Sequence, residues 1–139
     1  MLRFLLDTDH LTLLEHRHAL VVQNVAKQPQ GAVGLAVVTV EESLRGRLAA
    51  IAQASDGAAR IARYALLVQS LLRFQQFSIV PFDQSAEDQY QLVRGMRLRF
   101  GTRDQKIAAI ALANHLTLVK RNNRDFGQVP GLVLEDWSV

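Results

Sequence analysis

The chain has 139 residues, 49% of them apolar, and it contains no cysteine. We expect one domain, 1–139, because a chain of this length can bury about two-thirds of its unfolded surface in a single core. The missing cysteines exclude thiol catalysis, Cys-ligated zinc, iron–sulfur clusters and disulfide scaffolds. The formal charge of +3 comes from 16 basic and 13 acidic residues. Most of the basic residues are arginine, whose planar fork suits phosphate, so the composition permits nucleic acid binding.

The sequence gives no sign of export or membrane insertion. Asp7 and Asp9 interrupt the apolar N-terminus too early for a signal peptide. The longest apolar stretches, such as Ile107 to Ala113, are much shorter than the roughly 18 to 20 residues of a spanning helix. We therefore expect a cytoplasmic protein with no membrane partner.

Short apolar runs alternate with helical stretches along the chain. The runs predict buried strands at Leu2–Leu6, Val33–Thr39, Phe77–Val80, Leu116–Val119 and Leu132–Leu134. The helices are predicted at Leu11–Lys27 with a break, Val40–Gln53, Ala58–Gln75, Ser85–Arg99 and Thr102–Asn114. Because the strands are almost continuously apolar, both of their faces should be covered. The alternation predicts an α/β fold with a parallel sheet.

One helix carries a regular apolar stripe. In Ala58–Gln75 the apolar residues recur at three- and four-residue spacing, at Ile61, Ala65, Val68, Leu71 and Leu72. We expect this stripe to pack rather than to react. The four histidines form no metal-binding pattern and are expected at the surface or at helix ends, and Trp137 is expected at a sheet edge or core margin.

Acidic residues follow several of the predicted strands, where ligands bind in open parallel sheets. These acids are Asp7, Asp9, Glu41, Glu42, Asp83, Asp104 and Asp125. Each one also has an ordinary structural interpretation, as a helix cap, a partner of a helix dipole or a turn residue. Together they would repel one another at one sheet edge unless a shared proton or a hard cation neutralised them. A metal-dependent phosphodiesterase is therefore the leading hypothesis.

Four segments stand out in chain order: Leu5-Leu-Asp7-Thr-Asp9, Val40-Glu-Glu42-Ser-Leu-Arg-Gly46, Gly101-Thr-Arg-Asp104-Gln-Lys-Ile-Ala-Ala109 and Arg121-Asn122-Asn-Arg-Asp125-Phe126. In order and approximate spacing they resemble the motifs of PIN-domain ribonucleases, and most of all VapC-like toxins of bacterial toxin–antitoxin systems. The resemblance extends from Leu2 to about Trp137. It implies a PIN-like three-layer sandwich, with a central parallel sheet of about five strands flanked by helices.

The resemblance also implies roles for individual residues. The catalytic and metal-binding acids would be Asp7, Glu42, Asp104 and Asp125. Glu42 is preferred to Glu41 because it stands four residues before Gly46. Thr8 would orient the site through its backbone and hydroxyl, and Asn122 would be a polar residue in the same loop as Asp125.

Lys120 departs from the family pattern, which commonly has Thr or Ser at this position. The lysine could pair with Asp104 or Asp125 and compete with a cation, or it could point to solvent and hold substrate phosphate. The departure puts the strength of metal binding in question.

The implied activity is that of a Mg²⁺- or Mn²⁺-dependent endoribonuclease that leaves a 5′-phosphate by in-line attack of water. The resemblance further implies a homodimer and a partner antitoxin that inhibits by occupying the acidic pocket, often with a basic side chain. Basic residues near Asp104 would bind RNA, or would form a solvated helix face: Arg94, Arg97, Arg99, Arg103 and Lys106.

Two alternatives remain open from the sequence. A phospho-receiver signalling domain also combines acids after its first strand with an acid after the third and a late lysine, here Asp7, Asp9, Asp83 and Lys120. It leaves Glu42, Asp104 and Asp125 unexplained. The second alternative is a PIN-like module that binds RNA or a partner without cutting, which Lys120 motivates.

Overall fold

The structure, a computed structural model, describes residues 1–121 and 124–139. Its centre is one parallel sheet formed by β1 (Phe4–Leu6), β2 (Val33–Ala36), β3 (Ser78–Val80), β4 (Thr117–Val119) and β5 (Leu134–Glu135). The strand order is β3-β2-β1-β4-β5. The chain therefore builds the sheet outward from β1 in one direction and then, after β3, in the other.

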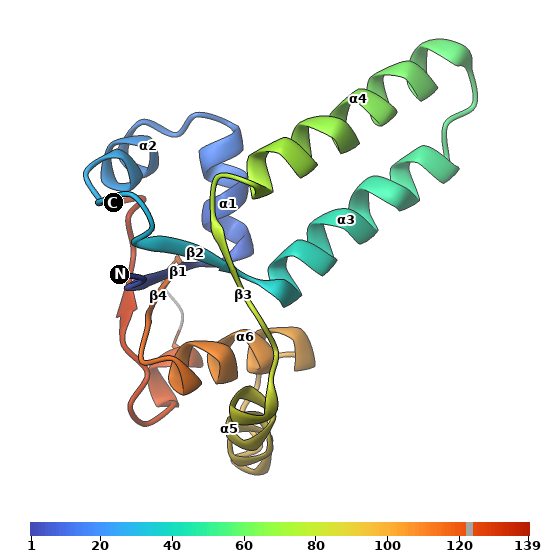
Figure 1. Cartoon of the computed structure of the whole chain (residues 1–139). Helices are drawn as coiled ribbons and strands as arrows, with labels where there is room; N and C mark the ends of the chain where they lie inside the picture. Colours follow the sequence, from blue (N-terminus) through green and yellow to red (C-terminus); the bar gives the residue numbers. More distant parts are fainter. Residues whose placement is uncertain (122–123) are drawn as a thin grey trace.

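Helices cover both faces of the sheet: α1 (Thr8–Glu15), α2 (Ala19–Ala26), α3 (Val37–Ala52), α4 (Gly57–Phe74), α5 (Gln84–Gly95) and α6 (Thr102–Ala113), with a short 3₁₀ turn at Phe126–Gln128. Figure 1 shows α1 and α2 on one side, α6 and α5 on the other, and the α3–α4 hairpin extending away from the sheet. The predicted α/β class and the parallel sheet of five strands flanked by helices are confirmed. No helix in the described part of the chain is long and apolar enough to cross a membrane.

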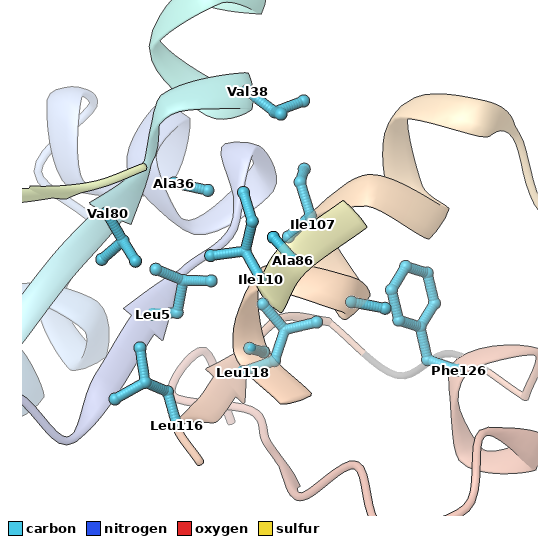
Figure 2. Close-up of a cluster of buried hydrophobic side chains, with 12 residues drawn as sticks. Leu5, Ala36, Val38, Val80, Ala86, Ile107, Ile110, Leu116, Leu118 and Phe126 are labelled. Atoms are coloured by element: carbon cyan, nitrogen blue, oxygen red, sulfur yellow. The ribbon is translucent and has the colours of Figure 1, made fainter. Parts of the chain in front are cut away.

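Alternate side chains of the central strand enter two separate cores. Leu5 points into the core beneath α6, where it belongs to one cluster with Ile107 and Ile110 (Figure 2). Phe4 and Leu6, on either side of Leu5 in the strand, belong to the other cluster, which includes Trp137. Because fully burying such a side chain contributes roughly 1.5–3 kcal/mol, both layers hold the sheet in place. The two-sided burial explains why the central strands β1 and β2 are apolar throughout, whereas the edge strands β3 and β5 are partly exposed.

The predicted strand Val33–Thr39 is too long by three residues. β2 ends at Ala36, and α3 begins at Val37, three residues before its predicted start at Val40. The β-branched run from Val37 favours a strand by local propensity, but Val38 and Thr39 are buried on the helix instead, so tertiary packing overrides propensity. As a result Glu42 lies in the second turn of α3, one turn after the buried Val38.

Other element ends also differ from the prediction. The first helix begins at Thr8 rather than Leu11, so it follows β1 almost directly. Helix α5 ends at Gly95 rather than Arg99, and Arg97 has a positive φ of 54° that a helix cannot continue through. Two of the basic residues proposed to bind RNA, Arg97 and Arg99, therefore lie in the α5–α6 loop.

The apolar stripe of α4 is exposed, which contradicts the expectation that it packs within the chain. Ile61 is 75% exposed, Val68 55% and Leu72 57%. The helix instead packs through its opposite side, where Ser70 and Phe74 are buried. The spacing identified an amphipathic helix correctly, but it could not tell whether this chain or another molecule covers the apolar face.

Candidate active site

Asp7 lies at the end of the central strand and is almost fully buried, with a side chain 5% exposed. It occupies the N-cap position of α1, yet within the described part of the chain its carboxylate makes no capping hydrogen bond. Oxygen Oδ1 is buried and has no hydrogen-bond partner among the described residues. A buried acceptor without a partner is costly, so helix capping does not account for this aspartate.

Glu42 reaches the same edge of the sheet from α3. Its Oε2 accepts a hydrogen bond of 2.9 Å from the hydroxyl of Thr8, and its Oε1 lies 2.9 Å from the Arg103 guanidinium. The adjacent Glu41 is exposed and pairs with Arg45 on its own helix. The helix therefore turns Glu42, rather than Glu41, towards Thr8, the residue next to Asp7.

Asp104 lies in the first turn of α6 and is partly buried. Burial raises the pKa of Asp104, opposed by Lys120, and the negative charge of Glu42 raises it further. The negative charge of Asp104 in turn raises the pKa of Asp7. Asp104 is thus electrostatically coupled both to Glu42 and to Asp7.

Burial and the neighbouring charges shift the protonation of Asp7. Burial raises the pKa of Asp7 to about 6; the attraction of Lys120 lowers it, while the charges of Asp9 and Asp104 raise it. The acid therefore resists ionisation although an ammonium group lies beside it. A carboxylate that burial destabilises in its ionised form, with further acids nearby, is one that a bound cation would stabilise.

Lys120 follows β4, the strand next to β1. Its Nζ lies 3.0 Å from Oδ2 of Asp7 and 3.6 Å from Oδ2 of Asp9. Of the two sequence-based alternatives, the one in which the lysine points to solvent is wrong, because its side chain is only 10% exposed. The lysine does pair with acids of the site, but its ion pairs are with Asp7 and Asp9, which the sequence did not indicate as its partners. The pairing follows from the adjacency of β1 and β4, which the sequence does not reveal.

Sequence reasoning missed His10, which is fully buried rather than at the surface. Its Nδ1 donates to Oδ1 of Asp9 at 2.9 Å, and its Nε2 accepts from the backbone N–H of Trp137 at 3.1 Å. The acceptor role of Nε2 assigns the ring proton to Nδ1. His10 thus connects the C-terminal segment to Asp9. The available signal was its place beside Leu11 and one turn before Leu14, on the apolar side of α1.

Asp125 is the remaining predicted acid, and it is partly buried at the start of the 3₁₀ turn. It lines an open pocket of about 500 Å³ together with Arg97, Arg99 and Arg124. Asn122, the predicted polar residue of the same loop, lies outside the described residues. The structure thus places Asp125 beside basic residues of the α5–α6 loop.

The other basic residues proposed to contact RNA lie in different surroundings. Arg103 forms an ion pair with Glu42. The Nζ of Lys106 lies 5.9 Å from the centre of the Tyr90 ring. Arg94 lies in the last turn of α5 and is exposed. Arg103 therefore belongs to the acid cluster itself, whereas Arg97 and Arg99 line the pocket that holds Asp125.

The donor chemistry fits a hard divalent cation. All the candidate ligands are carboxylate oxygens, which Mg²⁺ and Mn²⁺ prefer, and Oδ1 of Asp7 is unpartnered in the described ranges 1–121 and 124–139. Among these described residues, no group of three or more acidic or histidine side chains is already arranged so that it could hold a metal ion. The side chains of Lys120 and Arg103 bind two of the acids instead.

The sheet topology does not support a phospho-receiver domain. In the receiver strand order the third strand neighbours the first, so their acids meet. Here β2 separates β3 from β1. Asp83 instead caps α5, where its carboxylate accepts a hydrogen bond of 3.0 Å from the backbone N–H of Ala86. The ordinary structural interpretation of Asp83 is sufficient.

A family model described as the PIN domain matches residues 5–132, which include the whole acid cluster. The chain belongs to the PIN domain family. PIN domains are nucleases, and the gathered acids of this one agree with hydrolysis of a phosphodiester. No curated protein matches the chain in sequence.

Solved structures share the fold of this PIN domain at low sequence identity. A chain of DNA-bound VapBC from Salmonella typhimurium is 21% identical with a TM-score of 0.78, and the match covers 99% of both chains. FitAcB from Neisseria gonorrhoeae is 24% identical with a TM-score of 0.73, covering 96% of this chain and 97% of that one. A toxin–antitoxin complex from Klebsiella pneumoniae is 22% identical with a TM-score of 0.70, covering 93% and 94%.

Proposed function

We propose that this PIN domain is a Mg²⁺- or Mn²⁺-dependent endoribonuclease that acts as the toxin of a toxin–antitoxin pair. The observation that supports this proposal most is the buried carboxylate of Asp7. Its Oδ1 has no hydrogen-bond partner among the described residues, and the negative charge of Asp104 acts on it. The proposed catalytic and metal-binding residues are Asp7, Glu42, Asp104 and Asp125, with Thr8, Asn122 and Lys120 in support. Membership of a nuclease family and the fold shared with toxin–antitoxin complexes support the proposal.

A bound divalent ion would supply the charge that activates water and stabilises the developing negative charge on the phosphate. The protein's part is positioning. Thr8 holds Glu42 by its hydroxyl, and Arg103 holds the other oxygen of the same carboxylate. Asp7 is fixed by the backbone, because its N–H donates to Val119 O at 2.9 Å. Asp7 and Glu42 are therefore both held in place by hydrogen bonds, as a preorganised site requires.

Metal-dependent cleavage of RNA by the purified chain tests this proposal. We expect cleavage with Mg²⁺ or Mn²⁺ and none with EDTA, and a loss of at least about a hundredfold in Glu42→Gln and in Asp104→Asn, since a bound metal contributes several kcal/mol. Glu41→Gln is the matched control and should cleave normally, because Glu41 is exposed and paired with Arg45. Undiminished cleavage in both site variants would reject the site.

The second candidate is a PIN-like module that binds RNA or a partner without cutting it. It is favoured by the Lys120 ammonium 3.0 Å from Asp7, which already neutralises part of the cluster. Mn²⁺ binding by the wild-type chain with no turnover of RNA would support this second candidate over the nuclease.

A groove leads away from the acid cluster and suits a peptide segment of an antitoxin. One pocket of about 260 Å³ includes Thr8 and Glu42, and an adjoining pocket of about 230 Å³ extends to α4. The two share Glu15, His16 and Arg47. An antitoxin segment in this groove could place a basic side chain at Glu42. The shared fold with VapBC and other toxin–antitoxin complexes supports such a partner.

The exposed stripe of α4 suits a second copy of the chain. The stripe lies on the side of α4 opposite Ser70, which faces α3 through a hydrogen bond from Arg47. Contiguous exposed apolar residues of this kind usually mark a protein interface. We assign this surface to the homodimer and the groove to the antitoxin.

We predict that Val68→Glu converts a dimer of the purified chain into a monomer, because it places a charge in the middle of the apolar stripe. The mass in solution, measured by light scattering after gel filtration, reports the change. Ala62→Glu introduces the same side chain on the same helix outside the stripe and should leave the dimer intact. A wild-type monomer, or a dimer unaffected by Val68→Glu, would contradict the assignment.

A further inference from the structure

Lys120 is held in one position by contacts on three sides. Its ammonium group lies 3.0 Å from Asp7 and 3.6 Å from Asp9, and it stands 4.7 Å from the centre of the buried Phe126 ring. The backbone N–H of Lys120 donates to Glu135 O at 2.9 Å, which fixes the residue at the end of β4. Two carboxylates and an aromatic face form a favourable site for an ammonium ion.

The carboxylate of Asp9 is held by two hydrogen bonds. Its Oδ1 accepts from His10, and its Oδ2 accepts from the backbone N–H of Arg121 at 3.1 Å. These two hydrogen bonds fix the Asp9 carboxylate, whose Oδ2 lies 3.6 Å from Nζ of Lys120. Asp9 is therefore a second carboxylate held beside the ammonium group.

The ammonium group of Lys120 lies against two carboxylates, which favour its charged form. Lys120 occupies Oδ2 of Asp7, whereas Oδ1 of the same carboxylate is unpartnered in the part of the chain that the structure describes. A divalent ion at Oδ1 would thus bind within a few ångströms of a fixed positive charge, and the two would repel each other.

We propose that Lys120 is a built-in counter-ion of the acid cluster, which neutralises Asp7 in the metal-free protein and weakens the binding of the divalent ion. This inference rests on the proposed metal-dependent function and specifies how its site is regulated. The chain then binds the ion only when its concentration is high enough to overcome the ammonium charge.

Titration calorimetry with Mn²⁺ on the full chain tests the proposal directly. Lys120→Met keeps the length of the side chain and its packing on Phe126 but removes the charge, so we expect the Kd for Mn²⁺ to fall about tenfold. Lys120→Arg keeps the charge and should bind as weakly as the wild type. Lys27→Met, which removes an exposed lysine at the end of α2, is the matched control and should not change the Kd.

Thermal unfolding supplies a second readout that does not depend on activity. Without metal, Lys120→Met should melt roughly 4 °C below the wild type because Asp7 loses its partner. Saturating Mn²⁺ should then raise its melting temperature more than it raises that of the wild type, as tighter binding to the folded state requires. If Lys120→Met is unfolded without metal, refolding on addition of Mn²⁺ supports the proposal, and failure to refold contradicts it.

The outcomes separate this inference from the proposed function. A Kd for Mn²⁺ that is unchanged or higher in Lys120→Met overturns the counter-ion role, even if every variant cleaves RNA. Tighter Mn²⁺ binding in Lys120→Met without any RNA cleavage supports the counter-ion role and overturns the nuclease. Absence of Mn²⁺ binding in all variants overturns both.

Discussion

Replacing Asp7 with asparagine should abolish RNA cleavage and at the same time stabilise the metal-free protein at neutral pH. The carboxylate is buried, and its pKa of about 6 lies well above the value of 3.8 for an unperturbed aspartate. The shift of roughly two pKa units corresponds to about 3 kcal/mol against folding when the group is ionised. Asparagine has the same shape without the charge, so it removes this penalty together with the proposed metal ligand.

The sign of the pH dependence distinguishes this effect from a general change in packing. Between pH 3.8 and about 6 the folded protein binds more protons at Asp7 than the unfolded chain does. The contribution of Asp7 therefore favours folding at low pH and is lost as the pH rises through about 6. We expect Asp7→Asn to equal the wild type in stability near pH 4 and to exceed it by up to about 3 kcal/mol at pH 7.5.

Urea unfolding in EDTA at these two pH values measures the difference, and Glu41→Gln is the control for removing an exposed carboxylate. With Mn²⁺ the wild type should gain stability and Asp7→Asn should gain little, because the ion binds the folded state through Asp7. A variant less stable than the wild type at pH 7.5 without metal would show that the carboxylate stabilises the fold. A site that costs stability in this way is expected where function, rather than packing, retains a residue.

The sequence predicted the layers of the fold well because they depend on local patterns. Strands buried on both faces are apolar throughout, as in Phe4–Leu6, and the first three strands are each followed by a helix. The order of the strands depends on pairings far apart in the chain and could not be read from these patterns. The end of β2 was misplaced because the residues from Val37 to Val40 suit a strand locally, and only the burial of Val38 and Thr39 selects a helix.

The acids of the candidate site could be predicted because they follow the strands of a parallel sheet. The contacts of Lys120 and His10 could not. Asp7 and Glu42 follow adjacent strands, so their gathering at one edge could be predicted. The partner of Lys120 depends on β4 lying next to β1, and the burial of His10 depends on the C-terminal segment returning to α1. Contacts between distant segments of this kind leave no periodic signal in a sequence.

Phe126 links the apolar core to the proposed site, and its truncation should have the largest effect on stability. The ring is fully buried in the core beneath α6 (Figure 2) and stacks on Phe100 with centroids 4.5 Å apart. Its other neighbour is the ammonium group of Lys120. We expect Phe126→Ala to lower the free energy of unfolding by about 3–5 kcal/mol, because it removes the ring and leaves a cavity.

Comparing Phe126→Ala with a second variant, Phe126→Leu, distinguishes the packing of the ring from its interaction with the Lys120 charge. Phe126→Leu fills most of the space and should cost only about 1–2 kcal/mol, while it removes the aromatic face under Lys120. Val133→Ala, at a position 57% exposed, is the control and should change the unfolding free energy by less than about 0.5 kcal/mol. A cost below about 1 kcal/mol for Phe126→Ala in urea unfolding would mean that the core closes over the missing ring. A cost in the expected range would show that the ring beneath Lys120 is part of the rigid core.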